Sequence, residues 1–205
     1  MIDLYYWGTP NGQKITIALE EMELEYQIFP INILENDQFQ PDFLKISPNN
    51  KIPAIVDQDG PNGEAISVFE SGAILQYLGR KTALFYPTDE QDRVEVEQWL
   101  MWQMGGFGPM LGQNHHFSKF APERIAYATE RYVNETKRLY KVLNQQLIGQ
   151  KYVAGSYSIA DMAILPWVLR HEWQQIQLED YPYIKEYVER LTARPAVQKA
   201  LSIQL

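Results

Sequence analysis

Residues 48–72, PNNKIPAIVDQDGPNGEAISVFESG, decide the fold because they contain two short strands, a turn and the start of a helix. The apolar runs at 54–56 and 65–68 predict the strands, and the Asp-, Asn- and Gly-rich stretch between them predicts the turn. Pro53 precedes a strand, a position that sheets tolerate. Ser71 is a favoured residue for capping a helix. The segment therefore predicts a β-hairpin followed at once by a helix over 71–81.

The residues before this segment predict the other half of a small α/β domain. Apolar residues alternate in the opening IDLYYW, which predicts a strand with Ile2, Leu4 and Tyr6 on one face. A break containing proline and glycine follows, and then a helix. The order β-α-β followed by β-β-α predicts a thioredoxin-like fold. The expected ranges are 2–7 and 26–31 for the strands, 8–12 for the break and 41–45 for a short helix.

From about residue 88 the strand pattern disappears and helical spacing takes over. Ser158-Ile-Ala-Asp161 predicts a capping box at the start of one helix. Pro182 and Pro195 mark two further short helices. The fold class is therefore α/β plus all-α: a thioredoxin-like domain over 1–81, a linker over 82–87 and an all-helical domain over 88–205. Apolar residues at helical spacing are Val96, Trp99, Leu100 and Met104, and then Tyr132, Thr136, Leu139, Leu143 and Leu147.

Composition excludes several classes of function. The 205 residues carry a net charge of −8, so the basic surface that nucleic acid or an anionic membrane requires is not expected. The chain has no cysteine and 3 histidines, which excludes a disulfide framework, a thiolate zinc site and a Cys nucleophile and makes a His-rich metal site improbable. There is no apolar run of ~18 residues and no secretory signal pattern. We expect a cytoplasmic protein without a metal site.

Three segments of the first domain are expected to meet at one edge of the sheet. They are the helix start after the first strand, the X-Pro step before the third and the Ser71 helix after the fourth. The backbone of Ile52 can pair with an extended peptide if the bond to Pro53 is cis. Ser71 and nearby amides can donate to a carboxylate, and Glu70 can accept an ammonium group. Taken singly, each segment is also an ordinary turn or cap; together they predict a site for a short zwitterionic peptide.

With these motifs the chain resembles the glutathione transferase superfamily across essentially its whole length. NKIPAI and FESGAI are similar to the superfamily's cis-proline loop and γ-glutamyl-binding Glu-Ser, and SIAD to its C-terminal capping motif. Within the superfamily, the chain most resembles the bacterial Nu class. That class is related to the glutathione-transferase-like region of the yeast prion-forming nitrogen regulator. The segments that carry this closer resemblance are TPNG at 9–12, QF at 38–39, SPNNKIPAI at 47–55 and GGFGPMLGQNHHF at 105–117.

The resemblance implies a glutathione-dependent disulfide reductase that binds two glutathione molecules or one glutathione disulfide and acts on small disulfides. A chain without cysteine must take its thiol from the ligand. Hydroxyl and amide donors near the first helix are expected to stabilise the glutathione thiolate. A homodimer is also implied, in which Arg131 reaches the ligand of the other subunit. The expected catalytic residues are Thr9 and Asn11, and the expected binding residues are Gln38, Lys51, Ile52, Pro53, Glu70, Ser71 and Arg131.

The sequence leaves several alternatives open. Tyr5 or Tyr6 can stabilise the thiolate instead, although strand alternation allows at most one of them to point toward the site. Arg131 can pair within its own helix with Glu130 or Glu135. The whole protein can be a non-catalytic binding or regulatory module, or can catalyse conjugation or peroxide reduction. His115 and His116 are expected to be structural or to line a pocket, because adjacent helical residues point about 100° apart. Lys14, with Lys51 and Arg131, is expected to meet an anionic ligand.

Overall fold

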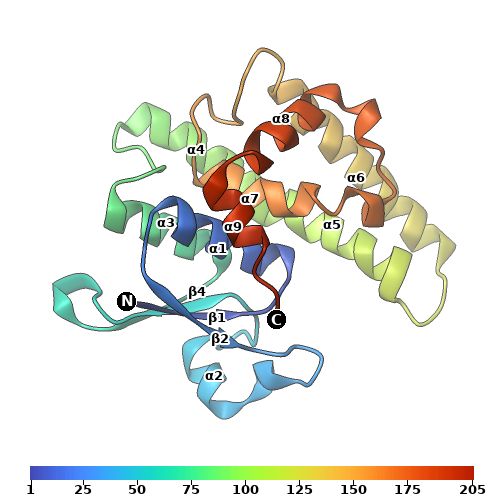
Figure 1. Cartoon of the computed structure of the whole chain (residues 1–205). Helices are drawn as coiled ribbons and strands as arrows, with labels where there is room; N and C mark the ends of the chain where they lie inside the picture. The colour runs from blue at the N-terminus through green and yellow to red at the C-terminus, as the bar shows by residue number, and fades with distance from the viewer. The chain divides into compact units, whose positions relative to one another are not determined.

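The computed structural model describes residues 1–205 and divides into two compact units (Figure 1). The first contains Met1–Tyr86 together with Arg194–Leu205, and the second contains Pro87–Ala193. The C-terminal segment therefore groups with the α/β unit, whereas the sequence pattern alone places everything from residue 88 in the helical domain. Ion pairs with α1 contribute to this grouping: Arg194 donates from Nε and Nη2 to the two carboxylate oxygens of Glu21, at 2.6 and 2.7 Å.

The first unit contains a four-stranded sheet in the order β2-β1-β3-β4. β1 runs parallel to β2 and antiparallel to β3, and β3 and β4 form the expected hairpin. This is the thioredoxin-like arrangement predicted from the sequence. The strands are β1 (Ile2–Tyr6), β2 (Tyr26–Pro30), β3 (Ala54–Asp57) and β4 (Ile66–Phe69), and the helices are α1 (Pro10–Glu21), α2 (Pro41–Ile46), α3 (Ser71–Thr82) and α9 (Pro195–Leu201).

Helices cover both faces of this sheet. α1 and α3 lie on one face and α2 on the other, as Figure 1 shows. Ile2, Leu4 and Tyr6 are almost completely buried, as expected for a strand face that is covered by helices. Tyr5 points to the opposite face, where its ring stacks on Phe29 with 5.2 Å between centroids.

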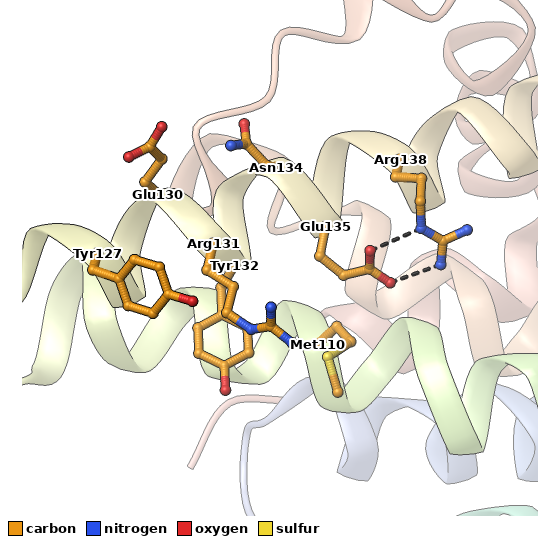
Figure 2. A pocket seen from close by; sticks show the side chains of 8 residues that line it. All are labelled: Met110, Tyr127, Glu130, Arg131, Tyr132, Asn134, Glu135 and Arg138. Carbon is orange, nitrogen blue, oxygen red and sulfur yellow. Dashed lines mark hydrogen bonds and ion pairs between the residues drawn. The ribbon is translucent and has the colours of Figure 1, made fainter.

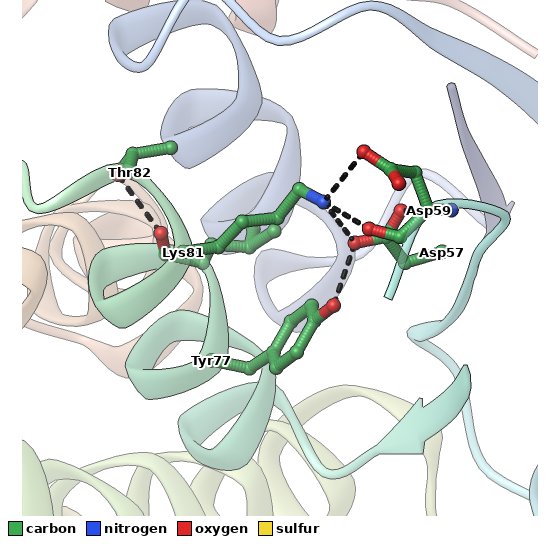
Figure 3. Close-up of polar contacts among 6 residues, drawn as sticks. Asp57, Asp59, Tyr77, Lys81 and Thr82 are labelled. Carbon is green, nitrogen blue, oxygen red and sulfur yellow. Dashed lines mark hydrogen bonds and ion pairs between the residues drawn. The ribbon is translucent and has the colours of Figure 1, made fainter. Parts of the chain in front are cut away.

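A polar cluster joins the end of β3 to α3 (Figure 3). The carboxylate of Asp57 is fully buried and accepts a hydrogen bond from the hydroxyl of Tyr77 at 2.6 Å. It also lies 2.9 Å from the ammonium group of Lys81, which donates to the main-chain carbonyl of Asp59 as well. Burial alone would raise the pKa of Asp57, but these donors lower it below its ordinary value. The cluster ties the second half of α3 to the end of β3.

The second unit is entirely helical. The capping box at the start of α7 is confirmed, because Asp161 accepts from the backbone N–H of Ser158 at 2.9 Å and the Ser158 hydroxyl accepts from that of Ala160. No helix of the structure is long and apolar enough to cross a bilayer. The helices are α4 (Glu90–Trp102), α5 (Gly108–His115), α6 (Ala126–Gln146), α7 (Ile159–Val168) and α8 (Pro182–Thr192), with π-helical turns at Gln103–Phe107 and His116–Phe120. Short 3-10 turns lie at Asp37–Phe39, Pro61–Gly63, His171–Gln174 and Leu178–Asp180.

Candidate functional site

The register of the sheet gathers the predicted segments at one end of it. Tyr5 pairs with Ala54, and Ala54 pairs with Phe69, so the three strands are level at this point. The chain leaves β1 toward Thr9, enters β3 from Pro53 and leaves β4 into Glu70 at this same end. The convergence expected from the order of the motifs is therefore a property of the strand pairing.

Thr9 lies at the N-cap of α1, and Asn11 is in the first turn of that helix. The Thr9 hydroxyl accepts a hydrogen bond from the backbone N–H of Gly12 at 3.2 Å. No residue with a Cβ fits in place of Gly12, because that atom would lie 2.4 Å from the carbonyl oxygen of Trp7 and 2.8 Å from the ring of Tyr6. The close packing brings the positive end of the α1 dipole to the edge of the sheet. This end of α1 therefore combines the hydroxyl of a cap residue with a helix N-terminus, and Asn11 belongs to the same turn.

The loop before β3 presents backbone rather than side chains. The Ile52–Pro53 peptide bond is cis, which is the conformation that the sequence reading required. Pro53 is buried, Ile52 is half-buried and Lys51 is exposed. The Ser47 hydroxyl donates to the Lys51 carbonyl at 2.8 Å and so closes the loop on itself. The arrangement leaves Lys51 available to an anionic group in solvent.

Gln38 lies in the connection between β2 and α2. Because Tyr6 pairs with Pro30, this connection begins at the same end of the sheet as the other segments. The Gln38 amide nitrogen makes a long, local hydrogen bond of 3.5 Å to the Ile33 carbonyl. Its Oε1 is buried and has no hydrogen-bond partner within the protein. An unsatisfied amide oxygen of this kind is an acceptor that a ligand can use.

Glu70 and Ser71 form the start of α3, but the residue at the helix cap is not the expected one. The expectation that Ser71 caps the helix is wrong: Glu70 occupies the cap position, with φ 70° and ψ 116°, and Ser71 is the first helical residue. A positive φ at a residue with a Cβ is unfavourable, so the surrounding packing must impose it. The consequence is that the exposed Glu70 carboxylate and the Ser71 hydroxyl, 7% exposed, belong to the same tight turn.

Lys14 is buried, which the sequence does not predict for a lysine. Lys14, which is expected to meet an anionic ligand, is 2% exposed, and its ammonium group donates to the Ser71 hydroxyl at 3.3 Å. Burial lowers its pKa to about 7, against a smaller opposing effect of the Glu70 charge. Helical periodicity contains the signal that was missed, since Lys14 lies four residues before the buried Ala18 on the same face of α1.

The two tyrosines near the end of β1 lie on opposite faces, as strand alternation requires. The ring of Tyr5 packs between Phe29 and Phe43, with centroids 5.2 and 6.0 Å away. Burial, and to a lesser extent Asp3, raises the pKa of Tyr5 above its ordinary value. Tyr6 is completely buried beneath Gly12 of α1. Tyr6 is thus a core side chain, and Tyr5 is a half-buried member of an aromatic cluster.

Arg131 lies within the second unit, in an open pocket of about 660 Å³ lined by α5 and α6 (Figure 2). Glu135 pairs with Arg138 rather than with Arg131, so the intrahelical pair considered from the sequence does not form there. Glu130, the other candidate, does not form an ion pair with Arg131. The neighbouring Tyr132 is stacked on Phe117, with ring planes 6° apart. The pocket is lined by Met110, Tyr127, Glu130, Arg131, Tyr132, Asn134, Glu135 and Arg138.

His115 and His116 have unlike surroundings in the second unit. His115 is 8% exposed, packs between Trp167 and Trp173, and has a buried Nε2 without a hydrogen-bond partner. Burial, followed by the charges of Arg170 and Lys119, lowers its pKa to about 4. His116 is exposed and makes an edge contact with Phe117. No group of three or more His, Asp or Glu side chains is arranged to bind a metal ion.

Family models match most of the chain. The model described as the N-terminal domain of glutathione S-transferase matches residues 2–80, and the one described as the C-terminal domain matches residues 107–195. The disulfide-bond oxidoreductase YfcG of Escherichia coli (strain K12) is 54% identical over 203 residues, covering 98% of this chain and 94% of that protein.

Solved structures with bound ligands are also similar. A glutathione transferase family member from Pseudomonas fluorescens Pf-5, with two glutathione molecules bound, is 43% identical, with a TM-score of 0.94 over 99% of this chain and 93% of that one. A glutathione transferase from Pseudomonas putida, with one glutathione disulfide bound per subunit, is 42% identical, with a TM-score of 0.95 over 100% of this chain and 92% of that one.

Proposed function

Because this chain belongs to the glutathione S-transferase family, we propose that it reduces disulfide bonds with glutathione as the reductant. One observation carries the proposal. The helix start at Thr9 and Asn11, the Ile52–Pro53 step and the Glu70-Ser71 turn meet at one end of the sheet in a chain with no cysteine. The site is suited to binding a thiol and supplies none of its own.

The reaction is thiol–disulfide exchange in two steps. A glutathione thiolate attacks one sulfur of the substrate disulfide, which forms a mixed disulfide and releases a substrate thiolate. A second glutathione thiolate attacks the glutathione sulfur of the mixed disulfide, which gives glutathione disulfide and releases the other substrate thiolate. The released thiolates take up the two protons that the glutathione thiols lost. Two glutathione molecules are oxidised for each disulfide reduced.

The protein contributes thiolate stabilisation and alignment. We assign to Thr9 and Asn11 the donors that lower the thiol pKa, assisted by the N-terminus of α1. The backbone of Ile52 pairs with the peptide, and Pro53 shapes the loop. Ser71 and Glu70 receive the carboxylate and the ammonium group of the γ-glutamyl end. A remaining carboxylate meets the side chain of Lys51, and the amide oxygen of Gln38 accepts a hydrogen bond from an N–H group of the ligand.

The active protein is proposed to be a homodimer in which the partner subunit's Arg131 reaches the ligand. Arg131 is exposed in an open pocket and has no ion pair of its own, which leaves its guanidinium available. Glutathione disulfide carries four carboxylates, and a guanidinium can bind one of them with two parallel hydrogen bonds. A cytoplasmic location is proposed as well, because reduction by glutathione requires a compartment in which the glutathione pool is kept reduced.

The test is turnover of 2-hydroxyethyl disulfide with glutathione, followed by coupling the glutathione disulfide formed to a reductase. We expect a rate above the uncatalysed exchange. A rate equal to that background, with glutathione still bound, would instead identify a non-catalytic binding module. Comparison with an aryl halide and with a hydroperoxide separates disulfide reduction from conjugation and from peroxidase activity.

A further inference from the structure

A buried lysine lies beneath the proposed binding site. Lys14 is 2% exposed, which is unusual for a side chain that normally keeps its charge in water. Its ammonium group reaches Ser71 across 57 positions of sequence and donates to the hydroxyl at 3.3 Å. Ser71 is itself 7% exposed and lies at the N-terminus of α3. The lysine charge is therefore one side chain away from the proposed carboxylate position.

The charged state of Lys14 is finely balanced. Burial lowers its pKa to about 7, so that the amine is about half protonated near neutral pH. Glu70, at the N-cap of α3, is the charged group that opposes this effect. The cationic side chains that reach α1 from α9 and its cap form ion pairs with other groups: Lys199 lies 2.7 Å from Glu20, and Arg194 binds Glu21. A new negative charge at Ser71 would act on Lys14 across a single hydrogen bond, whereas the ligand's ammonium group is proposed to lie on the exposed carboxylate of Glu70.

We propose, on the basis of the function given above, that Lys14 is a positioning residue for the glutathione carboxylate, acting through Ser71, and that ligand binding draws a proton onto its amine. In the unliganded protein part of the population contains neutral Lys14. A carboxylate held by Ser71 and the α3 N-terminus favours the ammonium form, because opposite charges at this distance attract strongly where water is excluded. The positive charge then holds Ser71 in place and completes the anion site.

Proton uptake on ligand binding would distinguish this role of Lys14 from that of an ordinary contact. A ligand that raises the pKa of a group takes up protons when it binds, and its affinity rises as pH falls through that range. Glutathione disulfide is the suitable probe, because it has no thiol whose ionisation would obscure the effect. Its amino groups also titrate, so the contribution of Lys14 is read as the difference between wild type and variants.

The experiment is calorimetric titration of the full-length protein with glutathione disulfide at pH 7.5, in two buffers of different ionisation enthalpy. We expect a fractional proton uptake in the wild type. Lys14→Arg retains the charge but has no proton to gain at this pH, so it should bind with nearly wild-type affinity and lose the uptake. Lys14→Met has a similar unbranched shape and no charge, so it should lose the uptake and bind about tenfold more weakly.

Stability measurements separate this role from a structural one. Removing a buried charge relieves its desolvation, so Lys14→Met should unfold at an equal or higher urea concentration than the wild type at pH 7. Lower affinity together with undiminished stability supports a positioning role. Equal proton uptake in wild type and Lys14→Met, or wild-type affinity in Lys14→Met, would overturn the proposal. Failure of the wild type to bind glutathione disulfide at all would instead refute the proposed function.

Discussion

Glu135 binds the guanidinium of Arg138 and leaves that of Arg131 unpaired. Two nearly parallel hydrogen bonds, from Arg138 Nε at 2.8 Å and from Nη2 at 2.7 Å, occupy both oxygens of the carboxylate (Figure 2). The Arg138 charge helps to lower the pKa of Glu135 below its ordinary value, chiefly through these bonds. With the carboxylate satisfied in this way, Arg131 remains an available cation on the rim of the pocket.

Arg131→Ala should weaken binding of glutathione disulfide without dissociating the dimer. The lost charge-assisted pair corresponds to about a tenfold change in Kd or more. Titration calorimetry gives the affinity, and sedimentation at micromolar concentration gives the oligomeric state. Lys137→Ala is the matched control, because it removes one positive charge from an exposed position on the same helix. Unchanged affinity in Arg131→Ala, or full reductase activity from a monomer, would contradict the cross-subunit role.

Asn11→Ala should slow disulfide reduction far more than it weakens glutathione binding. An amide that donates to the thiolate in the transition state is worth about 2–4 kcal/mol, and the variant should lose kcat accordingly. The groups at Ile52, Glu70 and Ser71 would still bind the peptide, so KM should change little. The pH dependence of the rate reports the thiol pKa directly and should shift upward. Unchanged turnover would transfer the role to Thr9.

Substitutions of Glu70 should affect stability and ligand binding differently, because the backbone of this residue is held at φ 70°. Glycine has no Cβ to clash at this φ, so Glu70→Gly should be more stable than Glu70→Ala by about 1 kcal/mol in urea unfolding. Both variants lack the carboxylate that is proposed to receive the ligand's ammonium group, so both should bind glutathione weakly. If Glu70→Ala proved the more stable of the two, the positive φ would not be a source of strain.

Asp57→Ala should destabilise the protein by about 2–3 kcal/mol, because it leaves the hydroxyl of Tyr77 and the ammonium group of Lys81 without their carboxylate (Figure 3). Chemical denaturation at pH 7 measures the effect. Asp59→Ala removes a neighbouring carboxylate that is 81% exposed and 3.7 Å from Lys81, and it should change stability by less than about 0.5 kcal/mol. Equal losses in the two variants would argue against the buried cluster as the source of stability.

His115 should make the protein sensitive to acid. Its pKa is about 4 in the folded state, below the ordinary value of 6.5, so the unfolded chain binds more protons between these limits. The free energy of unfolding therefore falls as pH decreases from about 6.5 to 4. His115→Phe keeps an aromatic ring between Trp167 and Trp173 and should remove that part of the pH dependence. A difference between wild type and His115→Phe that is the same at pH 7.5 and pH 4.5 would show that His115 does not titrate as described.

The sequence by itself determined the order of strands and helices in the first domain, the capping box before Ile159, and the segments from which a site is built. Each of these depends on residues within a few positions of one another. The expected break at 8–12 was too long, because α1 already begins at Pro10. Strand alternation, a Pro at the first turn or a Ser-x-x-Asp box is decided locally, before any long-range packing. The absence of cysteine, which assigns the reactive thiol to the ligand, is also a property of composition alone.

Only the tertiary structure decided how those segments are used. Lys14 is buried because α3 packs over α1, and Ser71 lies inside its helix because the packing of β4 and α3 places the cap at Glu70. α9 attaches to the first unit through α1, and one of the contacts is the ion pair between Arg194 and Glu21, 173 positions away. Burial and partner choice are set by groups that are distant in sequence. Since desolvation and charge pairing both depend on which groups these are, the electrostatics of the site follow from the packing and not from the local pattern.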